Sequence, residues 1–232
     1  MTNASYKQFC PVAMAAEVLC TRWTMVLLRE LIAGSTRFNE LRRGLPRMSP
    51  ALLSKRLREL EESGVVKRER IAGSSEAYAY RLTDAGRDIQ PVVEAIGIWG
   101  QKWVETEPSL NNLDVELLMW DMRRNLNTDP VPPKRTVIEF VYSDLPQSQR
   151  RWWLIVEKDR AVDLCHVDPG LDVDLYATVS LRTMTEIWMG LRTVQNAVDQ
   201  NTLLLVGPSG LIDNMQSWLG LSPFAVQKKL IN

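Results

Sequence analysis

Cysteine and histidine are scarce in this sequence of 232 residues, which contains three cysteines and one histidine. Cys10, Cys20 and Cys165 form no closely spaced pair, so the disulfide framework of a small secreted protein is not expected. A zinc site of the usual kind needs several Cys or His ligands, and His166 is the only histidine available. We therefore expect a protein of a reducing compartment that holds no metal and no other cofactor.

Long apolar runs and catalytic motifs are missing as well. No stretch approaches the roughly 18 apolar residues of a membrane span, and the N-terminus has no basic segment followed by an apolar region. The sequence contains no nucleophile elbow, no GxGxxG and no P-loop, and His166 is more typical of a structural residue than of a base. These absences predict a cytoplasmic protein that is not an enzyme and has no membrane partner.

Charge is distributed unevenly although the whole chain is neutral. Residues 1–107 carry 16 Lys and Arg against 13 Asp and Glu, whereas residues 108–232 carry 12 against 15. Within residues 37–70 the count is 10 against 5. Salt screens the attraction between basic side chains and phosphates beyond a Debye length of roughly 10 Å. The local excess of basic residues, rather than the net charge of the whole chain, therefore favours contact with nucleic acid.

The chain is long enough for two domains of ordinary size. The segment EPSLNNL, which contains a proline and two asparagines, is a natural boundary between them. We therefore predict a domain over residues 1–107 and a second over residues 108–232.

The first half shows an ordered series of elements. Apolar residues recur at helical steps over residues 11–32, which predicts a helix facing a core, and a short helix follows over residues 37–46. The best-defined helix has Ser49 as its cap, Pro50 in its first turn and Gly64 just after its end. A hairpin with a Gly-Ser tip comes next, and then a helix that opens at Thr83 and runs to Trp103.

This order of elements is typical of a winged helix-turn-helix, which presents one helix to the major groove of duplex DNA. The helix after Ser49 is therefore the predicted recognition helix, with Lys55 and Arg58 as its leading contacts. Arg56 is ambiguous, because it lies nearer the leucine side, where its stem can pack while its guanidinium reaches a phosphate at the edge. The full set of predicted DNA contacts is Arg47, Ser49, Ser54, Lys55, Arg56, Arg58, Arg70, Ser74 and Ser75, with Lys67 and Arg68 beside them on the wing.

Several strings carry a family resemblance: CPV, RWT, LLREL, RFNELRRGLP, SPALLSKRLRELEESGVV and YRLTDAGR. Together they resemble the HxlR-type regulators, a winged-helix family related in architecture to the MarR type, over residues 10–103. The resemblance implies a homodimer in which the terminal helices pack across a two-fold axis. Two recognition helices would then meet a pseudo-palindromic operator.

The same resemblance gives Cys10 a candidate role, because in several members of the family a cysteine at this position responds to oxidants or electrophiles. A helix N-terminus next to Pro11 would stabilise its thiolate. The alternative is an unreactive thiol in a dimer interface.

The second half alternates between strand-like and helical segments. Four strand-like runs lie between residues 135 and 181, followed by a helix over residues 184–198, a strand over 201–207 and a final helix over 210–220. This order predicts an α+β domain with a largely antiparallel sheet. From residue 174 onward the sequence is similar to the sterol carrier protein fold, which implies an apolar cavity for lipids or other hydrophobic molecules. The fold class expected is thus a mainly α winged helix-turn-helix domain followed by an α+β, sterol-carrier-like domain.

Large apolar side chains are frequent in this second half, and they suit either an ordinary core or the lining of a ligand cavity. Because Trp152 and Trp153 are neighbours on a strand, they point to opposite faces and at most one lines a given cavity. The candidate lining residues are Trp120, Trp152, Trp153, Met184, Trp188, Met189, Met215 and Trp218.

Three hypotheses for function follow. The leading one is a homodimeric, DNA-binding repressor whose affinity for its operator is modulated by a hydrophobic small molecule. A second is a regulator that senses oxidants or electrophiles through Cys10. The third is a lipid-binding carrier, or an acyl-transferring enzyme, whose first domain only targets it.

Overall fold

The computed structural model describes residues 5–71, 77–105, 110–157 and 161–231. The chain divides into two compact units, Met1–Gly97 and Ile98–Asn232. The division falls within one helix, α6 (Gln90–Trp103). The boundary predicted between residues 107 and 108 lies among residues outside the described part of the chain.

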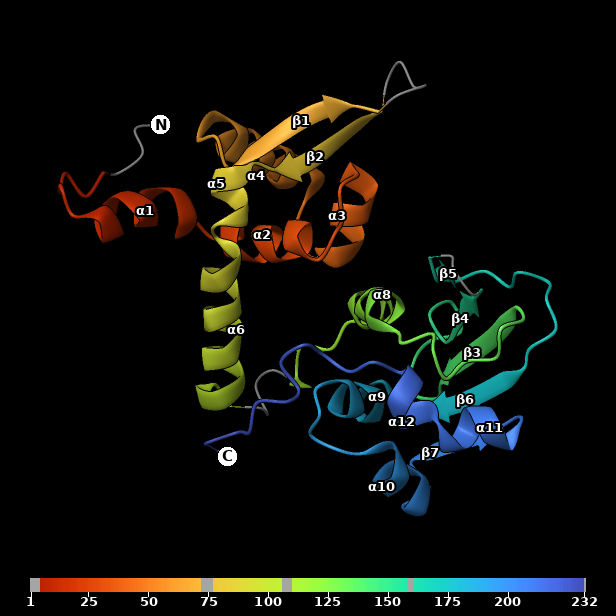
Figure 1. Cartoon of the computed structure of the whole chain (residues 1–232). Helices are drawn as coiled ribbons and strands as arrows, with labels where there is room; N and C mark the ends of the chain where they lie inside the picture. The colour runs from red at the N-terminus through yellow and green to blue at the C-terminus, as the bar shows by residue number, and fades with distance from the viewer. Residues whose placement is uncertain (1–4, 72–76, 106–109, 158–160, 232) are drawn as a thin grey trace. The chain divides into compact units, whose positions relative to one another are not determined.

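The first unit contains helices and a two-stranded hairpin (Figure 1). Its elements are α1 (Pro11–Leu19), α2 (Thr24–Ile32), α3 (Phe38–Gly44), α4 (Pro50–Glu62), β1 (Val66–Arg70), β2 (Tyr78–Leu82), α5 (Asp84–Arg87) and the start of α6. A hydrophobic core of buried leucines from α2, α3 and α4 joins them, closed by Val65 and Val66 at the base of the hairpin.

Helix α4 has the boundaries that its sequence predicts. The Ser49 hydroxyl oxygen accepts a hydrogen bond from the Leu52 backbone N–H at 3.3 Å, and Pro50 occupies the first turn. Gly64 follows the helix with a φ of 72°, a conformation that costs glycine little. Leu53 and Leu57 are buried, so the opposite face of the helix is left for solvent or a partner.

The prediction of a single core-facing helix over residues 11–32 is wrong. The chain breaks between α1 and α2, where Trp23 takes a left-handed conformation with a φ of 79°. Helix α2 buries Leu27, Leu28 and Leu31, whereas α1 buries none of its residues. Apolar periodicity identified the apolar face of α1, but it could not say what covers that face.

The hairpin β1–β2 is antiparallel, with Val66 opposite Leu82 and Arg70 opposite Tyr78. The helix expected from Thr83 onward is present as two pieces. Thr83 caps α5, and two turn residues then separate α5 from α6. Pro91, the second residue of α6, has no N–H to bond to the preceding turn, which explains the interruption.

The second unit is an α+β structure built on a five-stranded sheet of order β5-β4-β3-β6-β7 (Figure 1). Strands β3 and β6 are parallel and the other neighbours are antiparallel, which agrees with the predicted sheet. Its elements are α8 (Val115–Asn125), β3 (Thr136–Tyr142), β4 (Arg151–Val156), β5 (Asp163–Cys165), β6 (Leu175–Val179), α9 (Leu181–Trp188), α10 (Val194–Asp199), β7 (Leu203–Val206), α11 (Ser209–Asp213) and α12 (Met215–Trp218).

The helix predicted over residues 184–198 is divided into α9 and α10. Gly190 lies between them with a φ of 74°, and a Cβ there would stand 2.8 Å from the Cβ of Ala225. The left-handed backbone ends α9, and the close approach of Ala225 favours glycine at this position.

No single helix among the described residues is long and apolar enough to cross a membrane. The bent pair Pro11–Leu19 and Thr24–Ile32 passes the same test on length and composition alone.

Candidate nucleic-acid interface

The outer face of α4 carries three of the predicted DNA contacts. Ser54, Lys55 and Arg58 are all exposed, on the side opposite the buried leucines. A helix with a buried apolar face and an exposed basic face can lie in the major groove without disturbing its own core. The structure therefore leaves these three side chains exposed on α4, and their contact with DNA stays a prediction.

Lys55 is only loosely engaged within the protein. Its Nζ lies 3.8 Å from Oε1 of Glu59, and its side chain is 53% exposed. An exposed ion pair of this length contributes little to stability, so a DNA phosphate can replace the carboxylate at small cost.

Arg56 differs from its neighbours because its side chain is only 12% exposed. Its Nε donates a hydrogen bond to the Arg22 carbonyl at 3.1 Å, and its guanidinium also pairs with Glu59. These contacts tie α4 to the segment before α2. They favour a positioning role for Arg56 over the direct phosphate contact that the sequence left open.

A buried carboxylate that sequence reasoning missed lies against Gly44, the last residue of α3. Glu30 is fully buried and accepts hydrogen bonds from Ser35 Oγ at 2.7 Å and from Arg29 at 3.1 Å. Arg29 also donates to the Gly44 carbonyl at 3.1 Å. The available signal was an acidic residue between Arg29 and Leu31 in an otherwise apolar helix.

Arg47 and Ser49 follow α3, at the N-terminal end of α4. Both are exposed, and the Ser49 oxygen is already used as the helix cap. Its hydroxyl proton is still able to be donated, so capping and contact with a phosphate are compatible.

The hairpin carries a stack of basic side chains around Tyr78. The guanidinium of Arg68 lies 3.6 Å from the ring centroid of Tyr78 and that of Arg70 lies 5.9 Å away. Arg70 Nε also donates to the Tyr78 hydroxyl at 3.4 Å, and this hydrogen bond lowers the pKa of Tyr78. Tyr78 thus holds two arginines on one face of the wing. The predicted contacts Ser74 and Ser75 lie outside the described residues.

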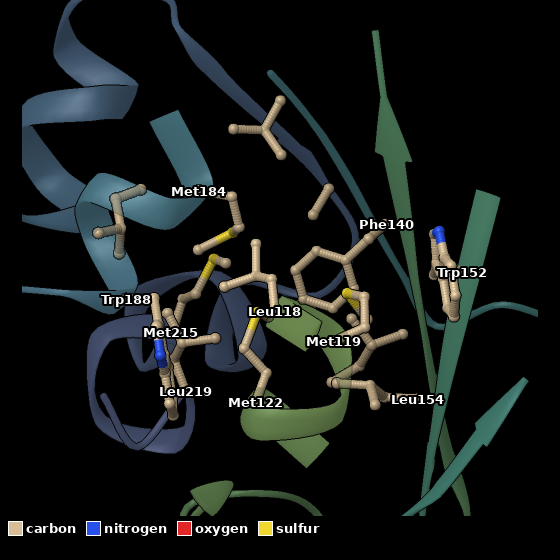
Figure 2. Packing of buried hydrophobic residues seen from close by; sticks show 14 of the residues in the cluster. Leu118, Met119, Met122, Phe140, Trp152, Leu154, Met184, Trp188, Met215 and Leu219 are labelled. Atoms are coloured by element: carbon tan, nitrogen blue, oxygen red, sulfur yellow. The ribbon is translucent and has the colours of Figure 1, made fainter. Parts of the chain in front are cut away.

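The candidate lining residues of the second unit fall into two groups. Trp152, Met184, Trp188, Met215 and Trp218 belong to one buried cluster, with Met189 packed against it. Figure 2 shows side chains from α8, α9 and α12 meeting Phe140 and Leu154 of the sheet.

Trp120 and Trp153 are also buried, but they lie outside that cluster. Arg123 lies 4.1 Å from the ring centroid of Trp120. Trp153 pairs with Glu139 in the sheet, on the face opposite Trp152. The eight residues therefore do not line a common space, and the opposed faces expected for Trp152 and Trp153 are confirmed.

Cys10 is exposed at the N-terminal cap of α1, directly before Pro11. Cys20 is exposed at the other end of the same helix, and Cys165 is partly buried on β5. Disulfides join none of these three cysteines within the described part of the chain. Among the same residues, no group of three His, Cys, Asp or Glu side chains could hold a metal ion.

Comparison with known proteins identifies the first unit. Residues 18–108 match the family described as HxlR-like helix-turn-helix. The HTH-type transcriptional regulator YvaP of Bacillus subtilis is 37% identical over 99 residues, which are 42% of this chain and 92% of YvaP. The chain belongs to the HxlR-like helix-turn-helix family. It is a transcriptional regulator of the HxlR type, with a winged-helix fold over roughly its first hundred residues.

Other relatives match the same part of the chain. YdeP of Bacillus subtilis, also an HTH-type transcriptional regulator, is 37% identical over 40% of this chain and 73% of its own length. The reduced form of the redox regulator HypR is 36% identical over 40% of this chain and 91% of HypR, with a TM-score of 0.38. These HxlR-like matches do not identify a sterol-carrier-like fold for residues 108–232, so that assignment stays a prediction.

Proposed function

We propose that the chain is a homodimeric, sequence-specific repressor that grips duplex DNA with α4 and the wing β1–β2. The observation that carries this proposal is the exposed face of α4, where Ser54, Lys55 and Arg58 stand clear of a leucine core. Bidentate contact of an arginine with guanine supplies roughly 1–3 kcal/mol of discrimination, whereas a lysine on phosphate supplies affinity. A repressor is preferred to an activator because binding over a promoter blocks polymerase without further machinery.

The uncovered apolar side chains of α1 support a homodimer. Val12 is 76% exposed and no residue of this helix is buried, and Phe9, two residues before the helix, is 98% exposed. Exposing such a face to water is unfavourable, at about 25 cal/mol per Å² of apolar surface. A second copy of the same helix region would cover it.

Helix α6 carries a second uncovered stripe, made of Val92, Ile96, Trp99 and Trp103. These residues recur at steps of three and four, so they share one face of the helix. A self-complementary stripe of this kind suits a two-fold interface, in which each copy offers the same surface.

The proposed effector is a hydrophobic small molecule bound by the second unit, where binding rather than catalysis is the proposed role. Support comes from the methionine and tryptophan side chains packed between the sheet and helices α8, α9 and α12 (Figure 2). Methionine adapts its shape easily, so such a core can open around a guest more readily than one of branched side chains. Binding would release DNA only if the molecule prefers the DNA-free arrangement.

A thiol switch at Cys10 is the second candidate for control. The thiol is exposed at the first turn of α1, which is the helix proposed to join the dimer. Oxidation there would alter the interface directly. If Cys10→Ser removes the release of DNA by diamide or quinone, this mechanism replaces the ligand model.

Selection of bound duplexes from a pool of random sequence tests the DNA-binding proposal, and it requires no identified operator. The full-length protein is expected to enrich a pseudo-palindrome with half-sites about 10 bp apart. Enrichment of no motif, or of a single half-site at all protein concentrations, would contradict a dimeric repressor.

A further inference from the structure

A pocket of about 420 Å³ opens in the first unit, beside the stem of the wing. Its size is within the roughly 300–1,000 Å³ of small-molecule sites. The lining comes from the end of α2, from both strands of the hairpin and from the segment α5–α6. None of this lining belongs to the proposed recognition helix.

The mouth of the pocket is basic. Lys67, Arg81 and Arg87 line it, and of the described residues that line it none is acidic. Lys67 and Arg81 are directly opposed in the hairpin, so their side chains leave the same face of the two strands. Arg87 is held at the edge by a hydrogen bond of 2.9 Å to the Leu82 carbonyl.

The carboxylates that accompany these cations stand outside the lining. Glu69 pairs with Lys67 at 2.7 Å and with Arg81 at 3.2 Å, and the hydrogen bond from Lys67 lowers the pKa of Glu69. Arg87 pairs with Asp84. Two carboxylates therefore serve three cations, which leaves one positive charge in excess. The three cationic side chains are 53–60% exposed, so a ligand can reach them.

The floor of the pocket is apolar. Leu31 and Ile32 at the end of α2 line it, together with Tyr80 and Leu82 of β2, whose side chains leave the strand on the face opposite Arg81. An inorganic anion would leave this surface wet, and a neutral lipid would leave the excess positive charge uncompensated. The combination suits a small organic molecule that has one carboxylate and an apolar body.

The geometry points to a binding site for a small organic carboxylate between the wing stem, α2 and α5–α6. Its carboxylate would be held by Lys67, Arg81 and Arg87, and its apolar body would lie on Leu31 and Ile32. DNA is the less suitable occupant, because Arg68 and Arg70 are gathered around Tyr78 on the other face of the hairpin.

Occupancy of this site would join the wing to the body of the unit. A ligand that binds one position of the wing more tightly than another shifts the wing toward that position. This consequence rests on the proposed DNA-binding function, whereas the carboxylate site itself does not.

Titration calorimetry of the full-length protein without DNA tests the site, with 2-naphthoate as the probe and uncharged 2-naphthamide as its matched analogue. Naphthoate is expected to bind at least about tenfold more tightly than the amide. The double variant Lys67→Gln with Arg81→Gln is expected to lose at least about tenfold of that affinity. Arg68→Gln, on the opposite face of β1, is the control and is expected to bind as the wild type does.

The site is overturned if naphthoate does not bind, if the amide binds equally well, or if the control loses as much affinity as the double variant. A mobility shift with a selected duplex then tests whether naphthoate binding is coupled to DNA binding. Coupling requires naphthoate to change the DNA affinity of the wild type but not that of the double variant. An unchanged shift in the wild type overturns the coupling. Failure to bind DNA at all contradicts the proposed function and leaves the calorimetric result for the site standing.

Discussion

At the scale of single residues, Gly44 lies directly against the carboxylate of Glu30. A Cβ at this position would lie 1.9 Å from the carboxyl carbon of Glu30, which is itself fully buried and bound to Ser35. The carboxylate cannot move away without losing its hydrogen bonds, so there is no space for the methyl group of an alanine at this position.

Gly44→Ala is therefore expected to lower the free energy of unfolding by about 1–3 kcal/mol. Chemical denaturation of the full-length protein measures the change. Gly210→Ala in α11 is the control, because a Cβ there meets no atom within 4 Å and Gly210 lies outside the helices proposed to form the dimer. Equal destabilisation by both variants would contradict the role given to Glu30.

Arg56 offers a second comparison, this time with Arg58 on the same helix. Arg56→Ala removes the hydrogen bond to the Arg22 carbonyl and the pairing with Glu59, so a loss of about 1–2 kcal/mol of stability is expected. Arg58→Ala changes an exposed side chain and is expected to stay within about 0.5 kcal/mol of the wild type. Thermal unfolding distinguishes them, and the reverse order would show that Arg56 is not the positioning residue.

At the scale of elements, the sequence predicts what local chemistry decides. Ser49, Pro50 and Gly64 lie at or next to the ends of α4, and each acts on the local backbone, so both ends of this helix could be predicted. The alternation of Trp152 and Trp153 between sheet faces is equally local.

Elements that depend on distant partners were predicted less well. Helix α1 is separated from α2 by a break and buries none of its residues. Its placement depends on a packing partner that the periodicity of the sequence does not specify. The hydrogen bond from Arg29 to the Gly44 carbonyl joins residues 15 positions apart, and the basic pocket gathers several separate segments. Both features required the folded chain.

Helix α6 gives a prediction at this scale. Ile96 is 50% exposed within the apolar stripe proposed to form the dimer, so Ile96→Glu would place a charge in that interface. We expect the dimer to dissociate at least about tenfold more readily, as measured by sedimentation at several concentrations. Glu94→Gln, on an exposed position of the same helix, is the control. A monomeric wild type, or an undisturbed Ile96→Glu dimer, would contradict the interface.

At the scale of the whole molecule, two units of opposite net charge are joined through one helix. The basic excess lies in the unit that carries α4 and the wing, and the acidic excess lies in the second half of the chain. Repulsion from phosphates would keep the second half off the DNA and leave it free to bind an effector.

Native mass spectrometry of the purified full-length protein tests the effector proposal. A hydrophobic molecule bound with one copy per chain is expected, and its loss should accompany a change in DNA affinity. If the protein carries no ligand and binds none from a panel of fatty acids and aromatic compounds, modulation through the second unit is wrong.

The most direct test of the DNA-binding mode is a mobility shift at fixed salt with an operator duplex selected by the wild type. Arg58→Ala and Lys55→Ala are each expected to weaken binding by roughly 1–3 kcal/mol while the dimer stays intact, and Lys55→Ala should also reduce the salt dependence. Lys228→Ala, which removes an exposed basic residue of the second unit, serves as the control. If both basic variants bind the operator as the wild type does, α4 is not the recognition helix.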